Sequence, residues 1–317
     1  MTAEDSAYYD RGRQVLEPDE PIGEVAALAD VVVTDVDDDE LRGLGVPISV
    51  DGLRGGDRPQ VLVTIRSFGS SGPTAGFRMT DLTEWASGGL AYGTRRPYPD
   101  DRERYVPVVP PGQQPQALAG LAAASGALAG WRWAEARREP IVVEVSVQEV
   151  MASMLHSIVP NFVWNGSVIG HPDTPTTAMG WLLPAADGDV YIRTVEAHQW
   201  EKLMTWMGDP DWAPLGATPE LRMVNGIALR ALLGDWTAPQ ARMDLLAEGQ
   251  RRKVPIALPR SLDDVLAWQH LRARGAWVTV ATDGGSEAPA VPVLEPPTWP
   301  VTRTAAAAEL VAAWSAT

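Results

Sequence analysis

The sequence predicts an α/β domain with a smaller α+β domain inserted at roughly residues 155–280. Two short β-branched runs, Val31–Val33 and Val61–Ile65, alternate with helical segments, which is typical of a parallel sheet with crossover helices. The chain has 317 residues, enough for both domains. Its 45% hydrophobic and 21% charged residues are typical of a globular protein.

Helical periodicity, proline positions and a further β-branched run predict the other elements of the larger domain. They are, in chain order, a helix over 80–90, a proline-rich connection over 93–115, a helix over 117–138 and a strand over 141–145. This strand leads into a helix that begins at Ser146. Ser146 and Glu149 fit a capping box, in which the two side chains satisfy exposed amides at the helix start.

The later part of the chain predicts shorter elements. They are a hairpin over 180–194 that turns at Asp187-Gly188, an amphipathic helix over 200–207 that ends at Gly208, a helix opened by Ser261–Asp264, a proline-rich linker over 288–300 and an alanine-rich helix over 303–315.

Composition excludes several classes of function. The formal net charge is -15, and binding to DNA or RNA depends on basic residues that neutralise phosphates, so we expect no nucleic-acid partner. The absence of cysteine excludes disulfides and cysteine nucleophiles, and the four histidines show no metal-ligand spacing, so no metal is expected. No signal peptide or membrane span is recognisable, which predicts a cytoplasmic protein without a membrane partner.

The acidic residues are concentrated near the start of the chain. Residues 1–60 hold 15 Asp and Glu against 5 Arg, and the densest stretch is Asp35–Glu40. Composition alone favours a solvated surface loop for this stretch.

Two segments invite a chemical interpretation. Glu149 lies where a buried strand meets a helix start, and a carboxylate there could act as a nucleophile on an acyl group; the alternative is that Glu149 only caps the helix. The Gly69–Gly72 segment lacks the Gly-Lys-Ser/Thr ending of a phosphate-binding loop, so by itself it indicates a strand-to-helix turn.

Three ordered segments carry a resemblance to a known family. They are Asp30-Val-Val-Val-Thr-Asp35, then Ser67-Phe-Gly-Ser-Ser-Gly-Pro73 followed by Asp81 and Ser87-Gly88, and finally Val143-Glu-Val-Ser-Val-Gln-Glu149. In this order and spacing, the chain resembles the class III CoA-transferases, the CaiB/BaiF family, which also contains acyl-CoA racemases.

The resemblance implies a Rossmann-like large domain with a parallel sheet over residues 1–154, a small α+β domain over 155–280, a return to the large domain over 281–317, and an interlocked dimer. It implies that the carboxylate at the Glu149 position, usually an Asp, takes the acyl group from a CoA thioester as a mixed anhydride. Implied CoA or substrate contacts lie at Phe68, Gly69, Arg78, Asp81, Asp35 and Val36. A CoA thioester is the expected substrate, and no tightly bound cofactor is expected.

The chain departs from the family pattern where CoA would bind. The family begins with a strand, a helix and a further strand that carry part of the CoA pocket, and we interpret this chain as a member shortened at its N-terminus. Carboxylates of Asp35–Glu40 would repel CoA phosphates. The racemase branch needs a His near residues 112–116, where this chain has none, so racemisation is the less expected activity.

Three hypotheses about function stay open. The first is CoA transfer between a carboxylic acid and an acyl-CoA through an acyl intermediate on Glu149, which we favour because Glu149 retains a carboxylate. The second is a non-catalytic or half-site subunit, paired in a heterodimer with a full-length paralogue instead of forming a homodimer. The third is a repurposed fold that acts on a non-CoA substrate in specialised metabolism.

Overall fold

The computed structural model divides the chain into two compact units. The first unit comprises Met1–Ile169 with Trp277–Thr317, and the second comprises Gly170–Ala276. The structure describes residues 14–16, 20–94, 96–97, 105–106, 108, 111–156, 158–166, 180–280, 286–289, 303–305, 308 and 312. Among the helices in these ranges, none has both the length and the apolar character needed to cross a membrane.

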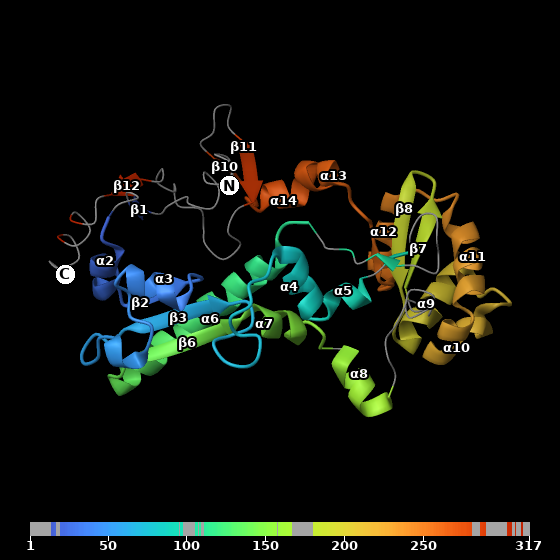
Figure 1. The fold of residues 1–317 in the computed structure, drawn as a ribbon. Helices are drawn as coiled ribbons and strands as arrows, with labels where there is room; N and C mark the ends of the chain where they lie inside the picture. Colours follow the sequence, from blue (N-terminus) through green and yellow to red (C-terminus); the bar gives the residue numbers. More distant parts are fainter. Residues whose placement is uncertain are drawn as a thin grey trace. The chain divides into compact units, whose positions relative to one another are not determined.

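A three-stranded parallel sheet forms the centre of the first unit. Its strands are β2 (Val31–Thr34), β3 (Val61–Arg66) and β6 (Ile141–Ser146), in the order β2-β3-β6 (Figure 1). Val61 pairs with Val31 on one side and with Ile141 on the other. Val61, Leu62 and Val63 are fully buried, as expected for a central parallel strand covered on both faces. The predicted parallel sheet is thereby confirmed.

The long helix α6 (Gln114–Arg137) packs closely on this sheet. Gly126 and Gly130 make the approach close, because an added Cβ at either position would lie 2.9 Å from a methyl carbon of Val143. Ala123 and Ala134 on the same face are buried and join the core that the sheet and the helix share. Small side chains at the contact therefore set the distance between the helix and the sheet.

The remaining elements of the first unit are short. They are β1 (Gln14–Leu16), α2 (Ile22–Leu28), α3 (Asp38–Gly43), the 3-10 helix η1 (Val50–Gly52), α4 (Asp81–Ser87), α5 (Leu90–Gly93), β4 (Arg96–Pro97), β5 (Tyr105–Val106), α7 (Val147–Ser153), α8 (Ile158–Asn165), β10 (Trp277–Val280), β11 (Ser286–Pro289) and β12 (Arg303–Ala305).

Two predictions for the first unit were wrong in part. The helix expected over 80–90 is divided into α4 and α5, because Gly88 contacts Met151 and Gly89 adopts a left-handed φ of 87°. The helix expected over 303–315 does not begin at 303, because Arg303–Ala305 forms the strand β12, parallel to β1. Of the residues after 305, only 308 and 312 are among those described, so the rest of that prediction lies outside them.

The second unit is an α+β structure around a hairpin. Its elements are β7 (Gly180–Ala185), β8 (Gly188–Arg193), α9 (Ala197–Met207), the 3-10 helix η2 (Ala213–Gly216), α10 (Pro219–Val224), α11 (Gly226–Thr237), α12 (Arg242–Arg252), β9 (Ile256–Ala257), α13 (Leu262–Ala267) and α14 (Gln269–Ala273). The predicted hairpin is confirmed, as is the end of α9 at Gly208, which adopts a left-handed φ of 88°. Leu183, Val190 and Leu203 lie in one fully buried core.

Candidate functional site

A cavity of about 880 Å³ opens in the first unit beyond the carboxyl ends of the three parallel strands. Its lining includes Asp35 and Val36 after β2, Ser67 and Gly69 after β3, and Val147 after β6. Open α/β sheets bind their ligands at this edge, because loops and helix starts from several strands converge there. The cavity is therefore the candidate site.

The acidic segment, Asp35–Glu40, forms one side of the cavity, and three of its five carboxylates are paired with arginines. Asp37 pairs with Arg78, Asp38 with Arg66 at 2.7 Å, and Asp39 with Arg42 at 2.5 Å. These pairs offset part of the negative charge that the sequence places here, and Asp35 and Glu40 have no ion pair with a described basic side chain. They also occupy the three arginines that line the cavity. Within the described ranges, no group of three or more His, Asp or Glu side chains is placed to hold a metal ion.

Asp37 also fixes the start of helix α3. Its side chain is the N-cap and accepts a hydrogen bond from the backbone N–H of Glu40 at 3.0 Å. This hydrogen bond, together with the positive charge of Arg78, lowers the pKa of the Asp37 carboxyl. The acidic segment therefore contains an ordered helix start, at which the Asp37 carboxylate is the N-cap.

The loop after β3 is held over the sheet by a carboxylate from β6. Gly69 is buried with a left-handed φ of 82°. The next backbone N–H, that of Ser70, donates to Oε2 of Glu144 at 2.9 Å. The backbone N–H of Gln148 donates to the carbonyl of Ser67 at 3.0 Å, which ties the loop to the start of α7. The glycine-rich segment is therefore a fixed part of the cavity wall.

Glu84 of α4 is the buried carboxylate of the cavity wall. Its side chain is 6% exposed, and it accepts hydrogen bonds from Oγ of Ser67 at 3.3 Å and from Nε2 of Gln116 at 2.7 Å. Burial raises the pKa of the Glu84 carboxyl, the hydrogen bond from Ser67 opposes this, and the nearby charge of Asp81 adds to it. Nothing in the local sequence distinguishes Glu84 from an exposed helical residue, so the sequence interpretation missed it.

The structure brings four of the seven predicted site residues together. Asp35, Val36, Gly69 and Arg78 all line the cavity. Glu149, Phe68 and Asp81 do not belong to its lining, and each lies close to residues that do.

Phe68 and Asp81 support the wall from outside. The ring of Phe68 packs edge-on against that of Phe77, a lining residue, with centroids 6.3 Å apart. Asp81 begins α4, the helix that carries Glu84. Both residues lie next to the cavity, and direct contact of either with a ligand stays a prediction.

Glu149 lies in the first turn of α7, two residues after the lining residue Val147. Its side chain is exposed, and its backbone N–H donates to Oγ of Ser146 at 3.3 Å. The reciprocal hydrogen bond, in which the Ser146 backbone N–H would donate to the Glu149 carboxylate, is not formed, so half of the predicted capping box is present. The carboxylate is therefore not committed to capping.

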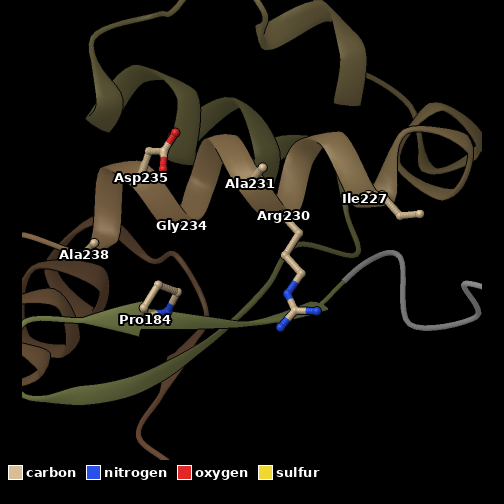
Figure 2. A pocket seen from close by; sticks show the side chains of 7 residues that line it. All are labelled: Pro184, Ile227, Arg230, Ala231, Gly234, Asp235 and Ala238. Atoms are coloured by element: carbon tan, nitrogen blue, oxygen red, sulfur yellow. The ribbon is translucent and has the colours of Figure 1, made fainter.

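A second cavity, of about 360 Å³, lies in the second unit between β7 and α11. Figure 2 shows that its wall is formed by Pro184 and by one face of α11, with the small residues Ala231 and Gly234 on the helix. Two charged side chains of opposite sign, Arg230 and Asp235, complete the lining. None of the described residues that line this cavity is a buried titratable group such as Glu84, so the first-unit cavity is the stronger candidate.

Comparisons with known proteins agree with the resemblance. Residues 19–308 match CoA-transferase family III. The probable CoA-transferase Rv1866 of Mycobacterium tuberculosis is 26% identical over 271 residues, which cover 80% of this chain and 32% of that protein. The chain thus spans about a third of the length of this curated relative.

Solved structures show the same fold. A CaiB/BaiF family protein from Brucella suis matches with a TM-score of 0.71 at 22% identity, covering 96% of this chain and 82% of that one. The hypothetical protein Rv3272 from Mycobacterium tuberculosis matches with a TM-score of 0.68 at 18% identity, covering 85% and 73%. The match to the family extends over most of the sequence, and the chain therefore belongs to CoA-transferase family III.

Proposed function

We propose that the protein transfers CoA between an acyl-CoA and a carboxylic acid, with Glu149 as the residue that receives the acyl group. Family membership supports a CoA-transferase or racemase-like role. The observation that carries the finer proposal is the position of Glu149. It presents an exposed carboxylate just after the carboxyl end of β6, beside the cavity residue Val147.

The proposed reaction needs only a carboxylate nucleophile and the CoA thiolate. A carboxylate oxygen of Glu149 attacks the acyl carbon, the carbon–sulfur bond breaks, and the thiolate leaves behind a mixed anhydride. The thiolate then attacks the side-chain carbonyl carbon of Glu149, which releases the acyl group as a carboxylate and leaves an enzyme–CoA thioester. The acceptor carboxylate attacks this thioester, and the released thiolate finally takes the new acyl group from the resulting anhydride, which regenerates Glu149.

The cavity residues have distinct proposed roles. Asp35, Val36, Gly69 and Arg78 are proposed to contact the substrate, since they line the cavity. Phe68 and Asp81 are proposed to hold lining residues in place. We retain a dimer, a cytoplasmic location and the absence of a tightly bound cofactor as proposals.

A second candidate function is a non-catalytic or half-site subunit that pairs with a full-length paralogue. The observation that favours it is the pairing of Arg42, Arg66 and Arg78 with aspartates of the acidic segment. Phosphate binding relies on basic side chains, and every arginine of the described lining is already engaged. The same observation fits a substrate other than CoA.

Trapping of the acyl-enzyme tests the first function. The purified protein is incubated with acetyl-CoA and hydroxylamine, and mass spectrometry of proteolytic peptides locates the product. We expect a hydroxamate at Glu149, retained in Glu149→Asp and lost in Glu149→Gln. The control Glu135→Gln, which removes an exposed carboxylate from α6, should keep the label. Absence of label in the wild-type protein, alone and with a co-expressed paralogue, contradicts the transferase proposal.

Native mass spectrometry tests the second function. The chain is co-expressed with the products of neighbouring genes and purified under mild conditions. A complex with a full-length paralogue supports the subunit role. Detection of homo-oligomers alone contradicts it.

A further inference from the structure

Among the described residues of the cavity wall, one buried carboxylate has no positively charged partner. Glu84 is 6% exposed and lines the cavity, but none of the described basic side chains forms an ion pair with it. The arginines of the lining are paired with aspartates of the acidic segment. A buried carboxylate without a cation is costly, so it must be stabilised by hydrogen-bond donors or by a proton.

The described residues supply only part of the hydrogen bonds that the Glu84 carboxylate can accept. An ionised carboxylate can accept about four hydrogen bonds, and Glu84 receives one from Ser67 and one from Gln116. Because both neighbours direct a hydrogen atom towards Glu84, their remaining oxygen lone pairs stay free as acceptors. Ser67, Glu84 and Gln116 all line the cavity, so this part of its wall presents acceptor oxygens to a ligand.

The surrounding charges reinforce this polarity. On α4, Asp81 adds negative charge beside Glu84. β3 contributes Arg66 to the lining, and Arg66 pairs with Asp38 of α3. Helix α6 contributes the uncharged Gln116, and α7 contributes the apolar Val147 to the lining. An anionic ligand group near Glu84 would therefore find no unpaired positive charge among the described residues of the lining.

We propose that Ser67, Glu84 and Gln116 form a donor-selecting subsite, which binds an uncharged or cationic ligand group that donates hydrogen bonds and rejects a carboxylate or phosphate. The proposal deepens the proposed function and rests on the cavity being its ligand site. For an acyl-CoA enzyme, it assigns a hydroxyl, amide or amine to the part of the substrate that reaches Glu84, and it disfavours dicarboxylic substrates.

A matched pair of small probes tests the subsite without requiring a thioester. Panthenol and pantothenate have nearly the same size, but panthenol ends in a hydroxymethyl group and pantothenate in a carboxylate. At about -0.3 kcal/mol per non-hydrogen atom, a probe of roughly 14 such atoms binds with a Kd of about 1 mM. Titrations of the ¹⁵N-labelled full chain, followed at the side-chain amide of Gln116 and the backbone amide of Ser67, measure both affinities.

We expect the wild-type chain at pH 7 to bind panthenol at least about tenfold more tightly than pantothenate. Glu84→Gln should reduce this ratio to about twofold or less, because the amide keeps the volume and can maintain both neighbouring contacts without the charge. Glu135→Gln, which removes an exposed charge from α6 outside the cavity, should leave the ratio unchanged. As the pH of the wild-type sample is lowered from 7.5 towards the raised pKa of Glu84, the ratio should also fall, which tests the subsite without any variant.

Three results would overturn the subsite. The first is equal binding of both probes by the wild-type chain, and the second is an affinity ratio that stays unchanged both in a folded Glu84→Gln variant and at low pH. The third is no binding of either probe at concentrations up to about twentyfold the expected Kd. The hydroxylamine experiment separates the two proposals. A hydroxamate at Glu149 without probe selectivity overturns only the subsite. Probe selectivity without a hydroxamate supports the subsite and contradicts acyl transfer.

Discussion

Replacement of Gly69 by alanine tests how the loop after β3 is held. A left-handed backbone costs a residue with a Cβ about 1–2 kcal/mol, and Gly69 has a φ of 82°. The new Cβ would lie 2.9 Å from Oε1 of Glu144, so the carboxylate must move. That movement breaks its hydrogen bond from the Ser70 N–H, at a cost of about 0.5–1.5 kcal/mol. We expect Gly69→Ala to destabilise the loop by about 2–3 kcal/mol.

Alanine substitutions at two neighbouring glycines separate the cost of the left-handed backbone from the cost of displacing the Glu144 carboxylate. Gly72 has a φ of 98° with nothing within 4 Å of an added Cβ, so Gly72→Ala should cost only the conformational term of about 1–2 kcal/mol. Gly76 has neither a left-handed φ nor a close neighbour, so Gly76→Ala should be neutral or stabilising by up to about 1 kcal/mol.

Hydrogen exchange measured by mass spectrometry gives the local free energy of opening for peptides from β3 and its loop. The double variant Gly69→Ala/Glu144→Ala should cost about 1 kcal/mol less than the sum of the single variants, because both lose the same hydrogen bond. Equal costs at Gly69 and Gly72, or strict additivity in the double variant, would refute the role assigned to Glu144.

Three further perturbations follow from the first unit. The raised pKa of Glu84 means that the folded state holds the Glu84 proton more tightly than the unfolded state does. The free energy of unfolding of the wild type should therefore fall as the pH rises from about 4.3 through the folded-state pKa. Over this range, differential scanning fluorimetry should show the melting temperature of Glu84→Gln increasing relative to that of the wild type. Gly88→Ala would place a Cβ 2.1 Å from that of Met151, so we expect a loss of about 3 kcal/mol and faster exchange in α7 peptides. Gln60→Leu removes a buried donor to the carbonyls of Ala26 and Ala29 and should cost about 2 kcal/mol, measured as a lower urea midpoint.

The sequence predicted the sheet because its signals are local. The runs at Val31 and Val61 contain consecutive β-branched residues, and such runs suit a strand that is covered on both faces. The S-x-x-E pattern at Ser146 located the start of α7 to within a residue, even though only half of the capping box forms. Elements whose formation depends mainly on their own residues could therefore be predicted from the sequence.

Glu84 could not be found in this way, because its burial depends on distant parts of the chain. Its partner Gln116 lies on α6, and Ser67 follows β3. The arginine partners of the acidic segment were equally hidden, since Arg66 and Arg78 lie far from it in sequence. Similarly, an alanine-rich stretch predicts helix locally, whereas Arg303–Ala305 forms a strand because β1 offers it a partner.

The pairing of β1 with β12 has a consequence for synthesis on the ribosome. Gln14 is synthesised well before its partner Arg303, so the first unit cannot be completed until the residues up to β12 have emerged. The second unit is one continuous stretch, Gly170–Ala276, and all its strand partners are available once that stretch is exposed. Because long-range pairings form slowly and domains fold as units, the second unit should reach its native structure before β12 has paired with β1 in the first unit.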